Sequence, residues 1–187
     1  MKHLAENLSF RDLVQRFPMV STGDVRKILH QAAAFYGGEG EDLGSQDLDD
    51  YFLYTDGASR GNPGEAGAGA VILDKDGNVV REVTEYLGEK TNNTAEYRAL
   101  ILGLMEVLRL GGSKVQIFSD SELIVKQVNG VYNVRNQGLK VLYNNVKELL
   151  ENFVRYDIRY ISREKNRHAD RLANKAIDER SGESFGP

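Results

Sequence analysis

The chain has 187 residues, 41% of them hydrophobic, and a formal net charge of −4 at pH 7. A chain of this length can bury one good core, so one main domain with a small appendage is expected. The absence of cysteine excludes disulfides, thiol nucleophiles and cysteine-based zinc sites. No apolar run approaches the roughly 18 residues of a membrane span, and the N-terminus lacks the apolar region of a secretory signal. We therefore expect a cytoplasmic protein with no membrane partner, and of the oligomeric states, which the sequence does not fix, we favour a monomer.

The first 50 residues differ in composition from the rest. They carry five Lys or Arg and nine Asp or Glu, so the remaining chain is neutral overall. Apolar residues at helical spacing in 9–17 and 25–36, interrupted by Pro18, predict a helical hairpin appendage over 1–38. Residues 39–50 hold six acids and no base, the composition of an acidic linker. The second helix faintly resembles a DNA-recognition helix, so nucleic-acid binding through Arg26 and Lys27 stays open beside a plain helical appendage or a dimer contact.

From residue 51 the pattern changes to β-rich runs. Residues 51–56, 67–74 and 78–88 are separated by Gly-rich or Asp-Gly turns and predict a three-stranded antiparallel meander. A helix over 93–110, a strand over 114–119, helices over 121–129 and 139–153, a strand over 156–162 and a helix over 167–180 follow. This order predicts an α/β fold over 51–180, with a flexible tail over 181–187. Its mixed five-stranded sheet has three antiparallel strands, then two parallel ones, and helices on both faces.

Four carboxylates share one kind of position, a strand end or the first turn of a helix: Asp56, Glu96, Asp120 and Asp170. Each one alone is explained by a turn, a helix cap or a helix dipole. In an α/β sheet, however, active groups collect at such points, so the four can converge. Converging carboxylates repel one another, which raises their pKa values or demands a cation. Oxygen ligands suit Mg²⁺ or Mn²⁺ rather than zinc, and two such ions suit in-line phosphodiester hydrolysis.

The segments TDGASRGNPG, TNNTAEYRALILGL, FSDSELIVKQVNG and ISREKNRHADRLANKA resemble, in order, the four signature segments of type 1 ribonuclease H. The resemblance covers residue 51 to about residue 178 and implies the ribonuclease H-like fold. It implies that the four acids are the metal-binding quartet, with two Mg²⁺ ions and Mn²⁺ as an alternative. The implied reaction is endonucleolytic hydrolysis of the RNA strand of an RNA/DNA hybrid, leaving 5′-phosphate and 3′-hydroxyl ends.

The same resemblance implies a set of residues that line the hybrid groove. Thr91 and Asn93 would lie near a DNA-strand phosphate, and small polar groups near the acids would recognise the 2′-hydroxyl. An ordinary turn at 62–64 and an ordinary helix cap at Asn93 are the competing explanations. The full set is Gly57, Ala58, Ser59, Asn62, Thr91, Asn92, Asn93 and Ser121.

Two features depart from the family pattern. The basic helix and loop that many members insert is replaced by the short segment NGVYNVRNQGLK, which predicts binding that is weaker, more salt-sensitive or assisted by another segment. The histidine of the loop before the last acid is replaced by His168, two residues before Asp170, where it is either a proton-transfer assistant or a partly exposed helix residue. The charge pattern of Arg163, Lys165, Arg167 and Arg171 is interpreted mainly as a solvated face, and contact with backbone phosphates stays open because the pattern borders the site. The glycines after Asp56 do not form a phosphate loop, and strand packing explains them better.

Two other functions remain open at the level of sequence. One is a non-catalytic module that binds the hybrid, against which the retention of all four acids argues. The other is a ribonuclease that acts on duplex RNA.

Overall fold

Three antiparallel strands begin the part of the chain that the computed structural model describes, residues 50–182. They are β1 (Asp50–Gly61), β2 (Gly64–Leu73) and β3 (Val79–Lys90). The β2–β3 turn is fixed by Asp74, whose carboxylate accepts from the backbone N–H groups of Asp76 and Asn78, both at 2.9 Å. Gly77 supplies the positive φ of 84° that this turn requires, so the hairpin that Asp76-Gly77 predicts is confirmed.

Two parallel strands complete the sheet on the other side of β1. They are β4 (Lys114–Ser119) and β5 (Arg155–Tyr160), and the strand order is β3-β2-β1-β4-β5. The parallel pairing of β1 with β4 ends at Thr55 and Ser119. The mixed five-stranded sheet, antiparallel and then parallel, is confirmed.

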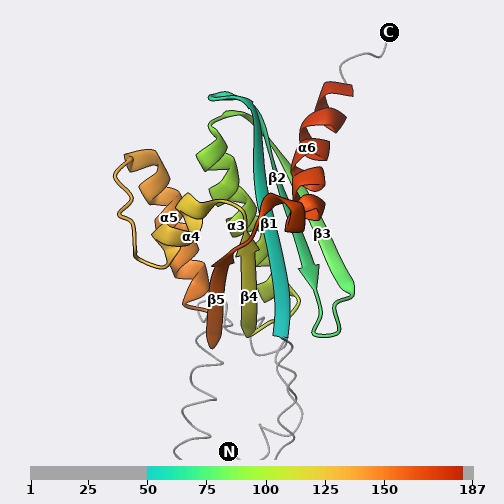
Figure 1. Cartoon of the computed structure of the whole chain (residues 1–187), viewed down its shortest axis with the longest axis vertical. Helices are drawn as coiled ribbons and strands as arrows, with labels where there is room; N and C mark the ends of the chain where they lie inside the picture. The colour runs from blue at the N-terminus through green and yellow to red at the C-terminus, as the bar shows by residue number, and fades with distance from the viewer. Residues whose placement is uncertain (1–49, 183–187) are drawn as a thin grey trace, which may run out of the picture. The chain divides into compact units, whose positions relative to one another are not determined.

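Helices lie on both faces of this sheet (Figure 1). One face carries α3 (Asn92–Arg109) together with α4 (Glu122–Val128) and α5 (Gln137–Leu150). A short 3-10 turn, η2 (Arg163–Lys165), leads into α6 (Arg167–Gly182), which covers β2 and its neighbours on the opposite face. Among residues 50–182, no helix is long and apolar enough to cross a membrane.

The main core lies between the sheet and α3. Its largest fully buried side chains include Leu53 of β1, Ile117 of β4 and Tyr97, Leu100 and Leu104 of α3. The Tyr97 hydroxyl donates to Gln127 Oε1 at 2.7 Å, so the one polar group of this buried ring is satisfied. This packing fixes α3 against β1 and therefore fixes where the first turns of α3 project.

On the other face, two glycines of β2 let α6 approach the sheet backbone. A Cβ at Gly69 would lie 2.5 Å from the Ala173 nitrogen and 2.6 Å from the Ala169 oxygen, and one at Gly67 would lie 2.3 Å from the Ala173 oxygen. Such distances are far below van der Waals contact, so only glycine fits. Strand packing, rather than phosphate binding, is therefore the role of these glycines.

Two local predictions are wrong. Strand β1 does not close at Asp56 but continues to Gly61, because β2 remains paired with it as far as Gly64. The cap of α3 is Thr91, whose side chain accepts from the Thr94 backbone N–H at 3.3 Å, and Asn93 already lies inside the helix. The predicted hairpin over 1–38, the linker before Asp50 and the end of the tail lie outside the described residues.

Candidate active site

Strand register brings the first two acids together. Asp56 lies in β1, one residue beyond the last pair with β4, and Asp120 follows the end of β4 directly. Their two carboxyl groups are in hydrogen-bonding contact. A parallel pair with this register places equivalent side chains at the same edge, so these two acids meet at the carboxyl end of the β1–β4 pair.

The third acid is brought in by a close approach between β1 and α3. A Cβ at Gly57 would lie 2.2 Å from the Glu96 nitrogen and 2.3 Å from the Ala95 carbonyl carbon, so a glycine is required there. The Gly57 backbone N–H also donates to the Glu96 carboxylate. Glu96 therefore projects from α3 directly beside the residue that follows Asp56.

Burial and mutual repulsion perturb two of these acids strongly. Asp56 and Glu96 are both buried, with only 6% and 7% of their residue surface exposed to solvent. Burial first, and then the charges of Asp120 and Asp170, raise the pKa of Asp56 to about 8. Burial, followed by the charges of Asp56 and Asp120, also raises the pKa of Glu96 well above its ordinary value. The four predicted acids therefore form one electrostatic cluster.

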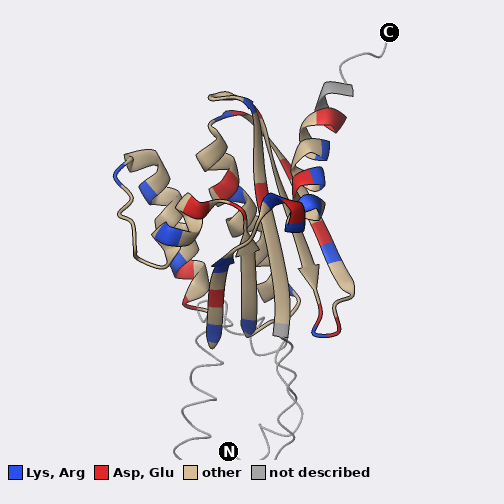
Figure 2. Cartoon of the chain, viewed as in Figure 1, with Lys and Arg blue, Asp and Glu red and all other residues tan. Residues whose placement is uncertain are grey.

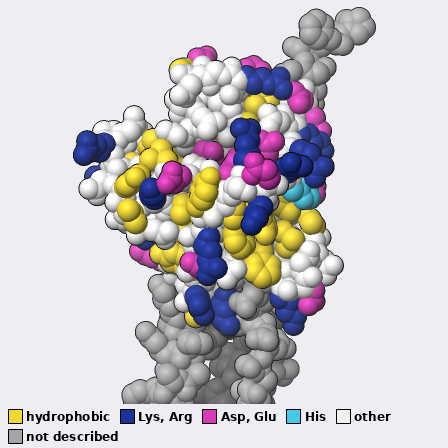
Figure 3. Space-filling model, viewed as in Figure 1, with side chains coloured by type: hydrophobic (Ala, Val, Ile, Leu, Met, Phe, Trp, Pro, Cys, Tyr) yellow, Lys and Arg dark blue, Asp and Glu magenta, His cyan; other side chains and the backbone are white. Residues whose placement is uncertain are grey.

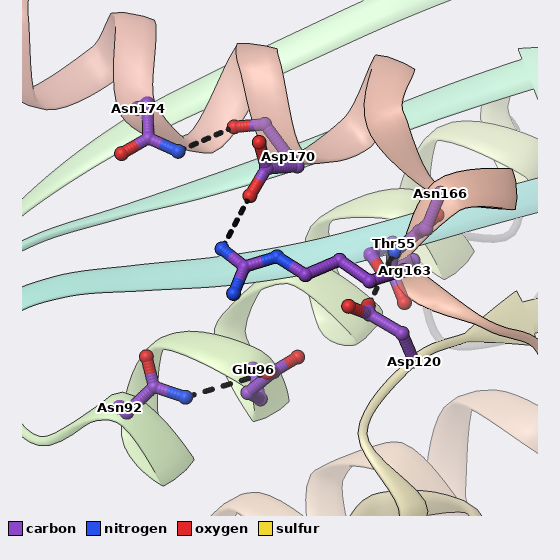
Figure 4. Close-up of polar contacts among 8 residues, drawn as sticks. All are labelled: Thr55, Asn92, Glu96, Asp120, Arg163, Asn166, Asp170 and Asn174. Carbon is purple, nitrogen blue, oxygen red and sulfur yellow. Dashed lines mark hydrogen bonds and ion pairs between the residues drawn. The ribbon is translucent and has the colours of Figure 1, made fainter.

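Asn166 ties this cluster to the start of α6. Its residue is fully buried, and its Nδ2 donates to the Thr55 carbonyl at 2.9 Å and to Asp120 Oδ1 at 2.6 Å (Figure 4). Among the described residues its Oδ1 has no hydrogen-bond partner. The sequence prediction missed Asn166, because an asparagine directly before a helix indicates a cap and nothing more.

The fourth acid, Asp170, lies in the first turn of α6 and is paired with a cation of the protein itself. Arg163 Nη2 donates to Asp170 Oδ1 at 3.0 Å, and in Figure 4 the Arg163 side chain extends between the labelled carboxylates. In this arrangement, no three His, Cys, Asp or Glu side chains within residues 50–182 are close enough together to hold a metal ion. The interpretation of Arg163 as part of a solvated face missed its contact with a site acid.

The donor chemistry nevertheless fits a hard divalent cation. The cluster offers only carboxylate and amide oxygens, the ligands that Mg²⁺ and Mn²⁺ prefer. Because repulsion raises the pKa of Asp56 to about 8, a cation among the four acids would relieve an existing strain. Asp56, Glu96, Asp120 and Asp170 are the residues that would hold it.

Most of the residues predicted to line a substrate groove lie on one rim beside Glu96. Asn62, in the β1–β2 turn, accepts from the Asn92 backbone N–H at 3.2 Å, which joins this turn to the start of α3. The Asn92 side chain donates to Glu96 Oε1 at 3.4 Å. The rim contains Gly57, Ser59, Asn62, Thr91, Asn92 and Asn93. Ala58 instead faces α6 on the other side of the sheet, because its strand partner Gly67 faces Ala173.

Other members of the predicted groove have structural partners as well. The Ser59 hydroxyl donates to the Lys90 carbonyl at 2.9 Å, which links β1 to the end of β3. Ser121 follows Asp120, precedes α4, and donates its backbone N–H to Ser119 Oγ at 3.1 Å. Asn93 is exposed at the start of α3.

His168 lies on α6 but is turned toward β3. Its Nε2 is 2.6 Å from Glu82 Oε1. Glu82 belongs to β3, which β2 separates from the strand that carries Asp56. No contact between His168 and the four acids supports proton transfer, which stays a prediction.

A mixed sheet of this order, with four acids gathered at the carboxyl end of its β1–β4 pair, is the arrangement expected of the nuclease family that the sequence resembles, and comparison with known proteins agrees. A family model described as reverse transcriptase-like matches residues 54–176. A bifunctional protein of Mycobacterium tuberculosis is 43% identical over 127 residues, which cover 67% of this chain and 35% of that protein. A ribonuclease H of Pseudomonas putida is 33% identical over 141 residues, covering 68% of this chain and 93% of that one.

A solved structure gives the same result. LC11-RNase H1 in complex with an RNA/DNA hybrid has a TM-score of 0.66 and 44% sequence identity, covering 69% of this chain and 97% of that one. The chain belongs to the type 1 ribonuclease H family, whose members are in general dependent on divalent metal ions. It spans about a third of the length of the mycobacterial relatives that it matches.

Proposed function

We propose that this chain is an endonuclease that hydrolyses the RNA strand of RNA/DNA hybrids, using two Mg²⁺ ions held by Asp56, Glu96, Asp120 and Asp170. The observation that carries the proposal is the clustering of four acids around a carboxyl whose pKa is raised to about 8. A protein keeps such repulsion where function requires it. Membership of the ribonuclease H family and the hybrid bound to LC11-RNase H1 support the choice of substrate.

The reaction is an in-line displacement at phosphorus. Water oxygen forms a bond to phosphorus while the bond from phosphorus to the 3′-oxygen breaks, so the products carry a 5′-phosphate and a 3′-hydroxyl. When bound, two divalent ions supply activation of the attacking water and stabilisation of the leaving oxygen. The chain's own part is to hold four carboxylates in place, with Asn166 fixing Asp120 through its hydrogen bond of 2.6 Å.

Discrimination of RNA from DNA belongs to the rim beside Glu96. A 2′-hydroxyl both donates and accepts a hydrogen bond, and an amide side chain offers both functions. Asn62 and Asn92 are exposed, and a hydrogen bond of 3.2 Å holds them together. Gly57 lies beside these residues, packed against the backbone of α3 at Glu96. Ser59, Thr91, Asn93 and Ser121 complete the proposed contacts with the two strands.

The test is cleavage of a labelled hybrid by the full chain in Mg²⁺. We expect Asp56→Asn to lower the rate by at least about a hundredfold, whereas Asp76→Asn, in an exposed turn, removes a carboxylate without effect. EDTA should abolish the activity, and mass spectrometry should find 5′-phosphate ends. Equal cleavage by wild type and Asp56→Asn would refute the assignment. Binding without cleavage in Mg²⁺ and Mn²⁺ would indicate a hybrid-binding module, and cleavage of duplex RNA would indicate a different substrate.

A further inference from the structure

Three arginines surround a hollow at the start of α6. The hollow has a volume of about 710 Å³ and is lined by Arg163, Glu164, Arg167, Asp170 and Arg171. Figure 2 marks basic positions at this end of α6 beside acidic ones, and Figure 3 shows basic side chains gathered there. Because Asp170 belongs both to this wall and to the acid cluster, the hollow opens beside the proposed reaction centre.

Two of these arginines are placed against the electrostatics of the free helix. Arg167 is the first residue of α6, where the helix dipole disfavours a positive charge. Arg171 follows one turn later, and like charges four residues apart on a helix repel. Both side chains are exposed, and within residues 50–182 neither one has an ion-pair partner within 4 Å, whereas Arg163 is engaged by Asp170. The nearest acid to act on Arg167 is the exposed Glu164 of the same hollow, whose pKa is lowered by hydrogen bonds and, to a lesser extent, by the charge of Arg167.

Basic residues elsewhere near α6 are arranged in the ordinary way. Lys175 lies 3.4 Å from Glu179, four residues along the helix, and Arg60 of β1 is paired with Asp178. The absence of such partners at Arg167 and Arg171 is therefore a local feature. It leaves two planar guanidinium groups available for an anionic ligand at a place where they do not stabilise the helix.

We propose that Arg167 and Arg171 bind a backbone phosphate of the RNA strand, beside the bond that is cut. Guanidinium groups match the geometry of phosphate oxygens and remain charged at all relevant pH values. The strand assignment follows from Asp170, because a wall shared with the acid cluster faces the strand on which that cluster acts. This inference rests on the proposed function, since it takes the hybrid as the ligand. It also supplies a basic contact in a chain that lacks the basic insertion of many relatives.

The first experiment measures hybrid binding by fluorescence anisotropy across a range of salt concentrations. The full chain carries Asp56→Asn so that the hybrid stays intact. Adding Arg167→Ala or Arg171→Ala should raise the Kd about threefold to tenfold and lower the slope of log K against log salt by about one. Arg155→Ala is the matched control. It removes the same charge at the start of β5, whereas the arginine hollow follows the end of that strand. Arg171→Lys, which keeps the charge, should keep the slope.

The second experiment locates the phosphate. Single phosphates of either strand are replaced by uncharged methylphosphonates, and each hybrid is measured with Arg171 and with Arg171→Ala. At one position of the RNA strand, the replacement should weaken binding with Arg171 present and have no further effect in Arg171→Ala. Coupling at a DNA-strand position instead would overturn the strand assignment. If every methylphosphonate weakened binding equally with Arg171 and with Arg171→Ala, the proposal that Arg171 contacts a phosphate would be overturned.

Failure of this inference is distinct from failure of the proposed function. If the wild type binds and cuts the hybrid while both alanine variants match Arg155→Ala in Kd and salt slope, the arginine site is refuted and the nuclease stands. If the wild type neither binds nor cuts the hybrid, the proposed function is refuted, and the inference with it.

Discussion

Replacing Asp56 by asparagine should stabilise the metal-free protein at alkaline pH while abolishing its activity. The pKa of this carboxyl is 3.8 in an ordinary setting and about 8 in the fold, so the folded protein binds its proton far more tightly than the unfolded chain does. The stability that this bound proton contributes is therefore fully present below about pH 4 and is lost as the pH rises through about 8. Asparagine has the shape of the protonated acid and never carries the charge.

The size of the effect follows from the shift. A difference between 3.8 and about 8 corresponds to about 6 kcal/mol. Rearrangement of the exposed parts of the site reduces this, so we expect Asp56→Asn to be more stable than wild type by about 2 to 4 kcal/mol at pH 9 and equal to it near pH 4.

The assay is urea unfolding in EDTA at pH 4, 7 and 9, with wild type, Asp56→Asn and the exposed-turn variant Asp76→Asn compared at each pH. Groups that titrate alike in all three proteins cancel in the difference. Adding Mg²⁺ at pH 9 should stabilise the wild type and not Asp56→Asn. The reasoning is refuted if the free energies of unfolding of wild type and Asp56→Asn run in parallel from pH 4 to pH 9.

Three further outcomes are expected. Mg²⁺ binding at pH 7 should release about one proton, since the pKa of Asp56 is about 8. The heat of binding measured by calorimetry should then differ between two buffers of different ionisation enthalpy. Equal heats in the two buffers would show that no proton is released. Gly57→Ala should lower the free energy of unfolding by about 2 kcal/mol and lower kcat, because its methyl would displace the backbone of Glu96. Urea unfolding measures the first effect and steady-state kinetics the second. An unchanged kcat would contradict this expectation. Asn166→Ala should lower the free energy of unfolding by about 1 to 3 kcal/mol. It should also lower kcat more than it changes KM, because Asp120 loses the hydrogen bond from Asn166. A change in KM alone would argue against a positioning role.

The five strands and their division into an antiparallel and a parallel part were predictable because each strand carries a strong local signal. The Asp76-Gly77 turn and the short apolar runs of β1 and β4 are readable without tertiary contacts. The end of β1 was not, because the extension to Gly61 depends on β2 remaining paired with it, which is an interaction between strands rather than a preference of either one.

The acid cluster was predictable from topology, whereas its supporting residues were not. A carboxylate at a strand end or in the first turn of a helix is informative by type and position, so four of them indicated one site. Asn166 supports the site through its contacts with Asp120 and Thr55, and Arg163 through its contact with Asp170. Nothing in the residue types announces these contacts, because an asparagine before a helix and an arginine in a basic segment have commoner explanations.

Gly69 controls the site without belonging to it. It pairs with Asp56 across the sheet, and the missing Cβ is what admits the backbone of Ala169 and Ala173 on either side of Asp170. A methyl group there would move α6 outward and widen the gap between Asp56 and Asp170. Ion size is matched to the spacing of oxygen ligands. If the four acids hold divalent ions as proposed, substitutions at Gly69 would change which ion binds best without replacing any of the four acids.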